Sequence, residues 1–428
     1  MKKVLLTILI CLIIITPVYM YWASNVNAPS DEDRTGNITT GNFRQSFDIT
    51  YHYGMEEHNI ILADSTTASS STQINFAYIT QMGRVYVFHG NNMNAVSGQL
   101  PFVDAIDMGV VTNNVLVLRS DNTVWRSALS GSTLGEFVEL ETIHPITQLV
   151  TGNSHAHVSD DIGRVWNLTP ATGAMNLLFN TLPVRKLLTT TTGSVGITDC
   201  NQVRLTSGSI TGSNVNSPFT GDIIDAWTIT NQGIVIQTTT GIYGTGSNNN
   251  GWFGWGTTGN TPWRRIPIPA GETLLSVAPL GLNTGVTHGA IYVTNSGRVF
   301  VAGTQIGALW GSPGAGSSHL VEIDTFDDFN IVQMLWSRRH IIMKNPYGQV
   351  ILFEMTSGTA STITRTPLSG SQFSTISILE WNNIPEYIPI RLGFNFDGWY
   401  LDSAYTIPLT LTTMPSHNLL VHARWISL

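Results

Sequence analysis

Charged side chains are scarce in this sequence. Asp, Glu, Lys and Arg make up 11% of its 428 residues, less than half the share of an average soluble domain. The formal net charge of -8 excludes an extended basic surface for nucleic acid. Hydrophobic residues, at 42%, exclude a generally disordered chain. What remains is a large chain with an uncharged polar surface, which is common among exported proteins.

Cysteine is nearly absent, with two residues in the whole chain. Cys11 lies in an apolar N-terminal segment, so Cys200 is the single thiol of the rest and is expected to be a small buried side chain. There is no CxxC pair, and without Cys11 no intrachain disulfide is possible. We therefore predict no disulfide scaffold, no metal or redox centre and no cofactor.

The motifs of common catalytic sites are also missing. The sequence has no GxSxG, no P-loop, no HExxH and no GxGxxG. Ser, His and Asp are abundant, but no spacing indicates a catalytic triad. We predict no catalytic residues, and a protein that is not an enzyme.

The N-terminus has the pattern of an export signal. Two lysines precede an apolar segment over residues 4–23, which is long enough to cross a bilayer. Two interpretations stay open: residues 1–28 are a signal peptide cleaved after Ala28, or they remain as a membrane anchor. Contact with a membrane is expected only through this segment, and only if it stays uncleaved. The polar residues 29–58 are predicted to be a flexible linker.

A short strand motif recurs seven times between residues 59 and 381. In the third copy residues 163–166 read Gly-Arg-Val-Trp, and the apolar anchors of the seven copies fall at residues 85, 124, 165, 203, 242, 299 and 350. An alternating apolar strand precedes the anchors, joined to them by turns with Asn, Asp or Gly. Strand-rich units with a period of about 40–50 residues are the signature of a β-propeller. We predict an all-β chain whose residues 59–381 form a closed ring of seven blades.

The first, third, fifth and sixth copies resemble a known family most strongly. Around the third anchor, Gly152, His155 and Gly163 have the spacing of the Gly-x-x-His…Gly-x-Val-Trp core of the regulator of chromosome condensation repeat (RCC1 type). The resemblance implies a seven-bladed propeller, in agreement with the count of anchors. It also implies these structural repeat positions: Gly83, Gly152, His155, Gly163, Gly244, Gly246, Gly254, Gly285, His288, Gly297 and Gly303. The founding member of the family binds nucleosomes, a role that does not suit an acidic, exported chain, so we predict no nucleic-acid partner.

Residues 382–428 break the repeat and resemble a second family. Phe396, Gly398, Trp399 and Tyr400, together with Trp425 near the end, match motifs of the internalin-type (Listeria–Bacteroides) B-repeat. The resemblance covers mainly the second half of that repeat. It implies a small β-grasp-like module of the kind found on bacterial surface and secreted proteins.

Four aromatic residues lie close together in the fifth copy: Trp252, Phe253, Trp255 and Trp263. One interpretation is an exposed platform that binds a protein or glycan partner. The other is that these side chains fill the space between two blades, as Leu does in the family motif. Both interpretations stay open, and the four residues are the candidate binding site.

Two polar groups of the third copy have a functional and a structural interpretation. His155 and His157 would share one face of a strand, as metal ligands do, but polar residues recur at the place of His155 in other copies, which favours hydrogen bonds to neighbouring backbone. Asp160 and Asp161 lack the spacing of a calcium loop and are expected to be solvated turn residues.

These predictions combine into a binding protein outside the cytoplasm. We expect an exported bacterial protein, secreted or at the cell surface, that uses a propeller face to recognise an unknown protein or glycan, for example in adhesion. Two alternatives stay open. One is a secreted inhibitor that covers the active site of an enzyme. The other is an extracellular enzyme acting on polysaccharide, because the catalytic residues of a propeller come from separate blades.

Overall fold

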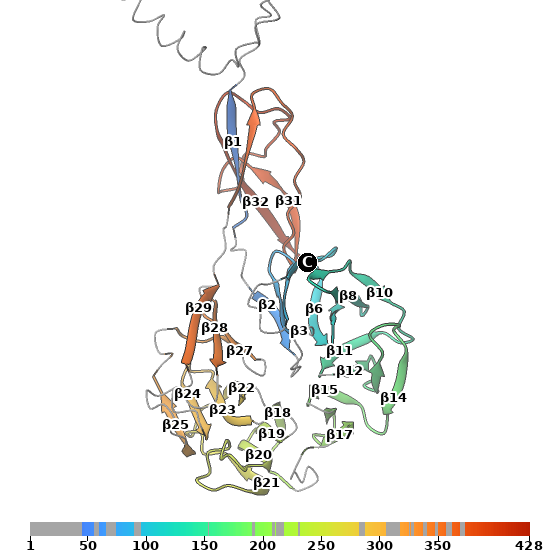
Figure 1. Cartoon of the computed structure of the whole chain (residues 1–428), viewed down its shortest axis with the longest axis vertical. Coiled ribbons are helices and arrows are strands. Elements are labelled where there is room, and N and C mark those ends of the chain that lie inside the picture. The colour runs from blue at the N-terminus through green and yellow to red at the C-terminus, as the bar shows by residue number, and fades with distance from the viewer. Residues whose placement is uncertain are drawn as a thin grey trace, which may run out of the picture. The chain divides into compact units, whose positions relative to one another are not determined.

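A computed structural model describes most of the chain beyond residue 44 (Figure 1). Internal contacts divide the chain into two units, and the second, Phe47–Leu428, holds nearly all of the described residues. The predicted signal or anchor of residues 1–28 and the repeat position Gly285 lie outside the described residues. The described ranges are 45–54, 60–65, 74–89, 96–152, 154–190, 193–207, 210, 218–229, 232–281, 287–304, 317–324, 326, 329–336, 340–346, 350–356, 362–368 and 373–428.

Seven antiparallel sheets follow one another along the chain, and each is a blade made of consecutive strands. Blade 1 consists of β2(Ile60–Ser65), β3(Ile74–Thr80), β4(Arg84–His89) and β5(Val96–Gln99). Blade 2 consists of β6(Ala105–Val111), β7(Asn114–Arg119), β8(Val124–Ser130) and β10(Val138–Leu140), with β9(Thr133–Leu134) paired to β8. Blade 3 consists of β11(Ile146–Thr151), β12(Ala156–Asp160), β13(Val165–Leu168) and β14(Met175–Phe179). Blade 4 consists of β15(Val184–Thr189), β16(Ser194–Thr198) and β17(Val203–Ser207), and blade 5 of β18(Ile223–Ile229), β19(Gly233–Thr238), β20(Gly241–Ser247) and β21(Asn260–Arg265). Blade 6 consists of β22(Leu274–Gly281), β23(Thr287–Thr294), β24(Val299–Gly303) and β25(Ser317–Ile323). Blade 7 consists of β26(Gln333–Trp336), β27(His340–Lys344), β28(Val350–Thr356) and β29(Thr362–Leu368).

The first strands of the seven blades form a closed circuit. β2 contacts β6, and the contacts continue through β11, β15, β18, β22 and β26, which contacts β2 again. Figure 1 shows the blades following one another in this order. The prediction of an all-β chain with a seven-bladed propeller is therefore confirmed. Within the described ranges every element is a strand, and no helix has the length and apolar character needed to span a bilayer.

The hydrophobic core lies between neighbouring blades. The second strands β12, β16 and β19 are buried at every residue, since the adjacent blades cover both of their faces. One apolar cluster, for example, joins Ile291 and Val301 of blade 6 to Met334 and Met343 of blade 7. In blades 1 to 6 a register shift near the start of the first strand bends that strand at the inner edge of the ring.

The turn between the second and third strands explains the Gly or Asn that precedes most anchors. Gly83, Gly163 and Gly297 have φ angles of 70°, 77° and 88°, and Asn122 and Asn201 have 69° and 56° at the equivalent places. This left-handed conformation is strained for most L-residues, but Gly lacks a Cβ and Asn tolerates it. The repeated motif therefore reflects a backbone requirement of the hairpin.

The eighth sheet joins the two ends of the described chain. Its order is β30(Phe373–Leu379)–β1(Ser46–His52)–β32(Leu419–Ser427)–β31(Phe394–Tyr400), and β1 runs parallel to β32. All propeller strands, β2 to β29, lie between β1 and β30 in the sequence. The propeller is thus an insertion in a small module, here called the closing module (residues 46–54 and 373–428).

This arrangement corrects two predicted boundaries. The sequence places residues 46–52 in the linker 29–58 and residues 373–379 in the propeller, yet both are strands of the closing module. The side chains of Ile49 and Tyr51 are buried in the core of the module, and polar residues alternate with them. A lone strand whose partner lies 370 positions away gives no hairpin signal in the sequence.

The closing module links the first blade to the last. β1 precedes blade 1, β30 follows blade 7, and these two strands are neighbours in one sheet. The module also contacts the turns of the first blades, because Leu392 N donates to Gln81 O at 2.8 Å and Gly393 N donates to Val103 O at 2.7 Å. The ring is therefore closed by packing of β26 against β2 and by strand pairing outside the ring.

Candidate functional site

The four aromatic residues of the expected platform are buried. Trp252 and Phe253 are fully enclosed, and Trp255 and Trp263 are only 8% and 9% exposed. The first three fill the space between blades 5 and 6, where Tyr292 Oη donates to Trp252 O at 2.7 Å, and the fourth packs between blades 4 and 5. The interpretation as an exposed platform is therefore wrong, because the loop after β20 folds into the core.

Replacing each buried indole by a phenyl ring distinguishes two of these tryptophans. Trp255 Nε1 donates to Arg265 O at 2.8 Å, whereas Trp252 Nε1 is buried without a hydrogen-bond partner among the described residues. We expect Trp255→Phe to lower the free energy of unfolding by about 1 kcal/mol more than Trp252→Phe, since both leave similar cavities and only one breaks a hydrogen bond. Urea unfolding measures both losses, and equal losses would contradict this assignment.

The repeat glycines allow close approaches that a side chain would block. At Gly246, where φ is 131°, a Cβ atom would lie 2.1 Å from Gln232 O, and at Gly152 it would lie 2.2 Å from the ring of His155. Such positions support packing within and between blades. The side chain of the repeat residue His288 lies outside the described parts of the structure.

His155 and His157 both contact the next blade. His155 Nε2 lies 3.0 Å from Gly193 O, and His157 Nδ1 lies 2.8 Å from Ser194 Oγ, both in blade 4. Burial, with a smaller contribution from His155, lowers the pKa of His157 to about 4. The contacts of His155 are those of a structural position. Among the described residues, no group of three or more His, Cys, Asp or Glu is placed to hold a metal ion.

Asp160 differs from its expected role as a solvated turn residue. Its buried carboxylate accepts hydrogen bonds from Arg164 Nε at 2.6 Å and Trp166 Nε1 at 2.9 Å, and from two backbone N–H groups. Burial alone would raise the pKa of Asp160, but the hydrogen bonds from Trp166 and Arg164 outweigh it and lower the pKa. Asp161 is exposed, as expected. Cys200 is exposed too, so the prediction that its side chain is buried is wrong.

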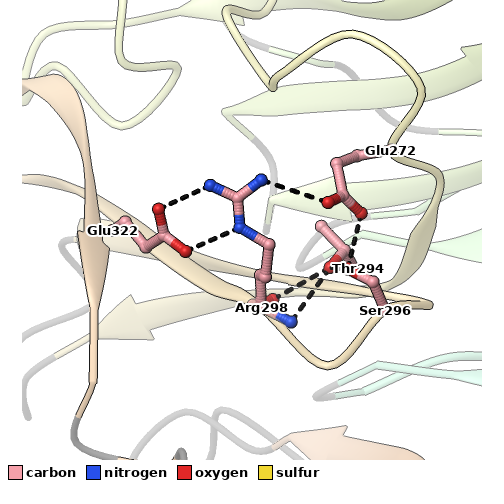
Figure 2. Close-up of polar contacts among 5 residues, drawn as sticks. All are labelled: Glu272, Thr294, Ser296, Arg298 and Glu322. Carbon is pink, nitrogen blue, oxygen red and sulfur yellow. Dashed lines mark hydrogen bonds and ion pairs between the residues drawn. The ribbon is translucent and has the colours of Figure 1, made fainter.

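Blade 6 contains a similar network around Arg298 (Figure 2). The guanidinium donates to Glu322 through Nε and Nη2, at 2.6 Å each, and to Glu272 through Nη1 at 3.1 Å. Ser296 Oγ also donates to Glu272, at 2.7 Å, and Thr294 Oγ1 accepts from Arg298 N at 3.1 Å. Two carboxylates compensate one guanidinium, so this network fixes the hairpin of the blade and does not favour anion binding.

Polar side chains on the first strands join neighbouring blades at the inner edge of the ring. Gln148 Oε1 accepts from a backbone N–H of blade 4 at 2.7 Å, and Thr189 Oγ1 donates to Thr151 O at 2.6 Å. Lys186 forms an ion pair with Asp225 of the next blade. The innermost strand of a blade has a sheet neighbour on one side only, so these side chains supply bonds on the other side.

Two carboxylates of blades 1 and 2 lie at the same inner edge. Burial, opposed by a hydrogen bond from Met108 N and reinforced by the charge of Asp64, raises the pKa of Asp107 to about 7. Asp64 Oδ2 in turn accepts from Val110 N at 2.8 Å. A carboxyl group with a raised pKa beside a second carboxyl group occurs in acid–base catalysts. Here, however, both carboxylates accept hydrogen bonds from the backbone of blade 2, which is a structural use.

One pocket is formed jointly by blade 1 and the closing module. Its volume is about 470 Å³, within the range of small-ligand sites. Arg84 is one of its wall residues, and Tyr53 Oη donates to Tyr387 Oη at 3.3 Å. The wall consists of Tyr53, Met82, Arg84, Gln99, Phe373, Ser374, Tyr387, Ile388, Pro389 and Ile390.

The pocket residues come from five separate stretches of the sequence. Arg84 opens β4 directly after the Gly83 turn, and Tyr53 follows β1. Tyr387 is held by Trp399, whose ring lies parallel to it with the centroids 6.1 Å apart and whose Nε1 donates to Tyr387 O at 2.7 Å. Burial and the hydrogen bond with Tyr53 raise the pKa of Tyr387, so its hydroxyl stays neutral. One cation, neutral hydroxyls and apolar walls together suit a carboxylate that carries an apolar group.

The fold is a seven-bladed β-propeller inserted in a small β module. No protein-family model matches the sequence, and no curated protein matches it. Among solved structures, Prp20p of Saccharomyces cerevisiae, whose binding to Gsp1p and histones has been studied, is 10% identical, with 82% of this chain and 92% of that chain covered and a TM-score of 0.51.

Two further propellers have lower similarity. YCF48 bound to the D1 peptide is 9% identical, with 73% of this chain and 95% of that chain covered and a TM-score of 0.45. The WD40 domain of Neurospora crassa Pan2 is 14% identical, with 72% of this chain and 91% of that chain covered and a TM-score of 0.42. At 10% identity the likeness to Prp20p shows the fold alone.

Proposed function

We propose that this protein is a non-catalytic, exported bacterial binding protein, secreted or held at the cell surface. The observation that carries the proposal is the pocket between blade 1 and the closing module, with Arg84 and the Tyr53–Tyr387 hydroxyl pair in an apolar wall. Its ligand is a carboxylate group on a protein or glycan partner, and the apolar wall favours an acidic protein segment with a hydrophobic neighbour. A non-catalytic role is supported by the inner edge of the ring, where the carboxylates of Asp64 and Asp107 accept hydrogen bonds from backbone N–H groups.

The N-terminal segment and the closing module support the export part of the proposal. Residues 4–23 have the pattern of a signal or anchor. Three motif residues of the proposed B-repeat pack together. The ring centroid of Phe396 lies 5.3 Å from that of Trp399 and 5.6 Å from that of Trp425. β1 adds a strand to the same sheet from upstream of the propeller. In our proposal it stands for part of the half of the B-repeat that the C-terminal sequence lacks.

The first test is capture of the partner with residues 29–428 as bait, against host surface extracts and culture proteins of the producer, with mass spectrometry of bound species. One stoichiometric protein partner supports the proposal, and an enzyme as partner would make the protein an inhibitor. If no partner is found and the protein degrades a polysaccharide from a panel, the non-catalytic proposal is wrong.

A charge reversal in the pocket tests the site itself. We expect Arg84→Glu to weaken binding of the captured partner at least tenfold, because the variant places a carboxylate where the proposed ligand carries one. Arg264→Glu is the matched control, since Arg264 is an exposed arginine that packs on Trp255 in blade 5, far from the pocket wall. Surface plasmon resonance at two salt concentrations measures the affinity of both variants for the partner. If Arg84→Glu binds as tightly as Arg264→Glu does, the binding site lies elsewhere.

A further inference from the structure

Two histidines face each other across the strands that join the ends of the module. His52 of β1 and His422 of β32 are register partners in the parallel pair, so their side chains leave the same face of the sheet. Their Nδ1 atoms are 3.1 Å apart, and their rings are nearly perpendicular, with an interplanar angle of 86°. In the metal-free protein this separation places a hydrogen bond between the two rings.

The separation of these nitrogens also matches two ligands of one metal ion. Imidazole nitrogens bind Zn²⁺ at about 2.0–2.1 Å, so two of them lie about 3.4 Å apart in a tetrahedral site and about 2.9 Å apart at a right angle. The observed 3.1 Å between His52 and His422 falls between these values. The distance between the two Nδ1 atoms therefore suits a shared ion.

The surroundings hold the ring of His52 in place and leave the site near solvent. His52 stacks on Phe373 of β30, with the ring centroids 4.5 Å apart and an interplanar angle of 19°. Both histidines are only partly buried. The chain carries a formal net charge of -8, which favours the approach of a cation. A rigid sheet with two preorganised nitrogens lowers the entropic cost of binding.

We propose that His52 and His422 bind a divalent transition-metal ion, of the class of Zn²⁺, Ni²⁺ or Cu²⁺, through their Nδ1 atoms, with solvent completing the coordination. No third protein ligand is placed for this among the described His, Cys, Asp and Glu side chains. The ion would join strands 370 residues apart in sequence and strengthen the tie between the two ends of the propeller. This proposal does not depend on the partner proposed for the pocket, although Phe373 stacks on His52 and also lines the pocket wall.

The test is metal titration of the untagged full chain by calorimetry, with Zn²⁺, Ni²⁺ and Cu²⁺, and with Mg²⁺ as the control ion. We expect one site per chain for the transition metals, no binding of Mg²⁺, and at least tenfold weaker binding in His52→Gln and in His422→Gln. His417→Gln, which removes an exposed histidine of the same module, is expected to bind as the wild type does. Equal affinity in all three variants, or no site in the wild type, overturns the proposal.

A second measurement does not depend on the folding of the variants. The electron paramagnetic resonance spectrum of the wild type with one equivalent of Cu²⁺ is expected to show two coordinated imidazole nitrogens, and fewer than two would overturn the proposal. The thermal unfolding midpoint is also expected to rise with metal concentration, because the ion binds the folded sheet and not the separated strands. A midpoint that does not move would contradict a shared site on β1 and β32.

Discussion

Tyr51→Ala is expected to lower the free energy of unfolding by about 3–5 kcal/mol, the range for a buried aromatic side chain. Tyr51 is 1% exposed, and its ring centroid lies 4.8 Å from that of Trp399 and 5.3 Å from that of Tyr387. The substitution also weakens β1, the strand that ties blade 1 to blade 7 through the closing module. Closing a loop of about 300 residues costs on the order of 5 kcal/mol, so loss of this tie affects the whole ring.

The measurement is urea unfolding combined with hydrogen exchange of β2 and β28, which belong to the first and last blades. Tyr51→Phe is the matched control, because the Tyr51 hydroxyl is buried without a hydrogen-bond partner among the described residues. Its loss should change the free energy of unfolding by less than about 0.5 kcal/mol, or increase it. If Tyr51→Ala speeds exchange only in the module and leaves both blades protected, the module does not hold the ring closed.

The fold of the propeller was largely predictable from local pattern. Each blade repeats a hairpin whose Gly or Asn turn and apolar anchor are close in sequence, so seven anchors predict seven blades. The closing module was predicted only in its second half. β1 pairs with residues 370 positions away, and no strand near it in the sequence pairs with it, so its seven residues resemble a linker with a few apolar side chains.

The candidate site was not predictable in the same way. Tyr53, Arg84 and Tyr387 belong to segments that meet only after the ring and the module have formed. Burial of the aromatic cluster followed from tertiary packing that composition does not encode: a polar, Gly-rich loop after β20 suggests exposure, but its rings fill the gap between two blades. The Leu of the family motif at the place of Phe253 was the one signal that favoured the interior.

Asp160→Ala is expected to lower the free energy of unfolding by about 3 kcal/mol, a large effect for a single residue at the end of a strand. The carboxylate has no exposed surface and accepts bonds from Arg164 Nε and Trp166 Nε1 as well as backbone N–H groups. Removing it leaves a partly buried guanidinium and a buried indole N–H without their acceptor. Asp161→Asn, which changes the exposed neighbour, is expected to have almost no effect.

The same residue predicts how stability depends on pH. Because the folded-state pKa of Asp160 is lowered, its ionised form adds stability above the unfolded value of about 3.9, and this contribution is lost as the pH falls through the folded pKa. Asp160→Asn carries no charge at any pH, so the difference in unfolding free energy between wild type and this variant should be constant above about pH 5 and shrink below about pH 4. Urea unfolding at pH 7 and at pH 3 measures that difference. A difference that stays the same in acid would mean that the buried carboxylate contributes through its hydrogen-bond geometry and not through its charge.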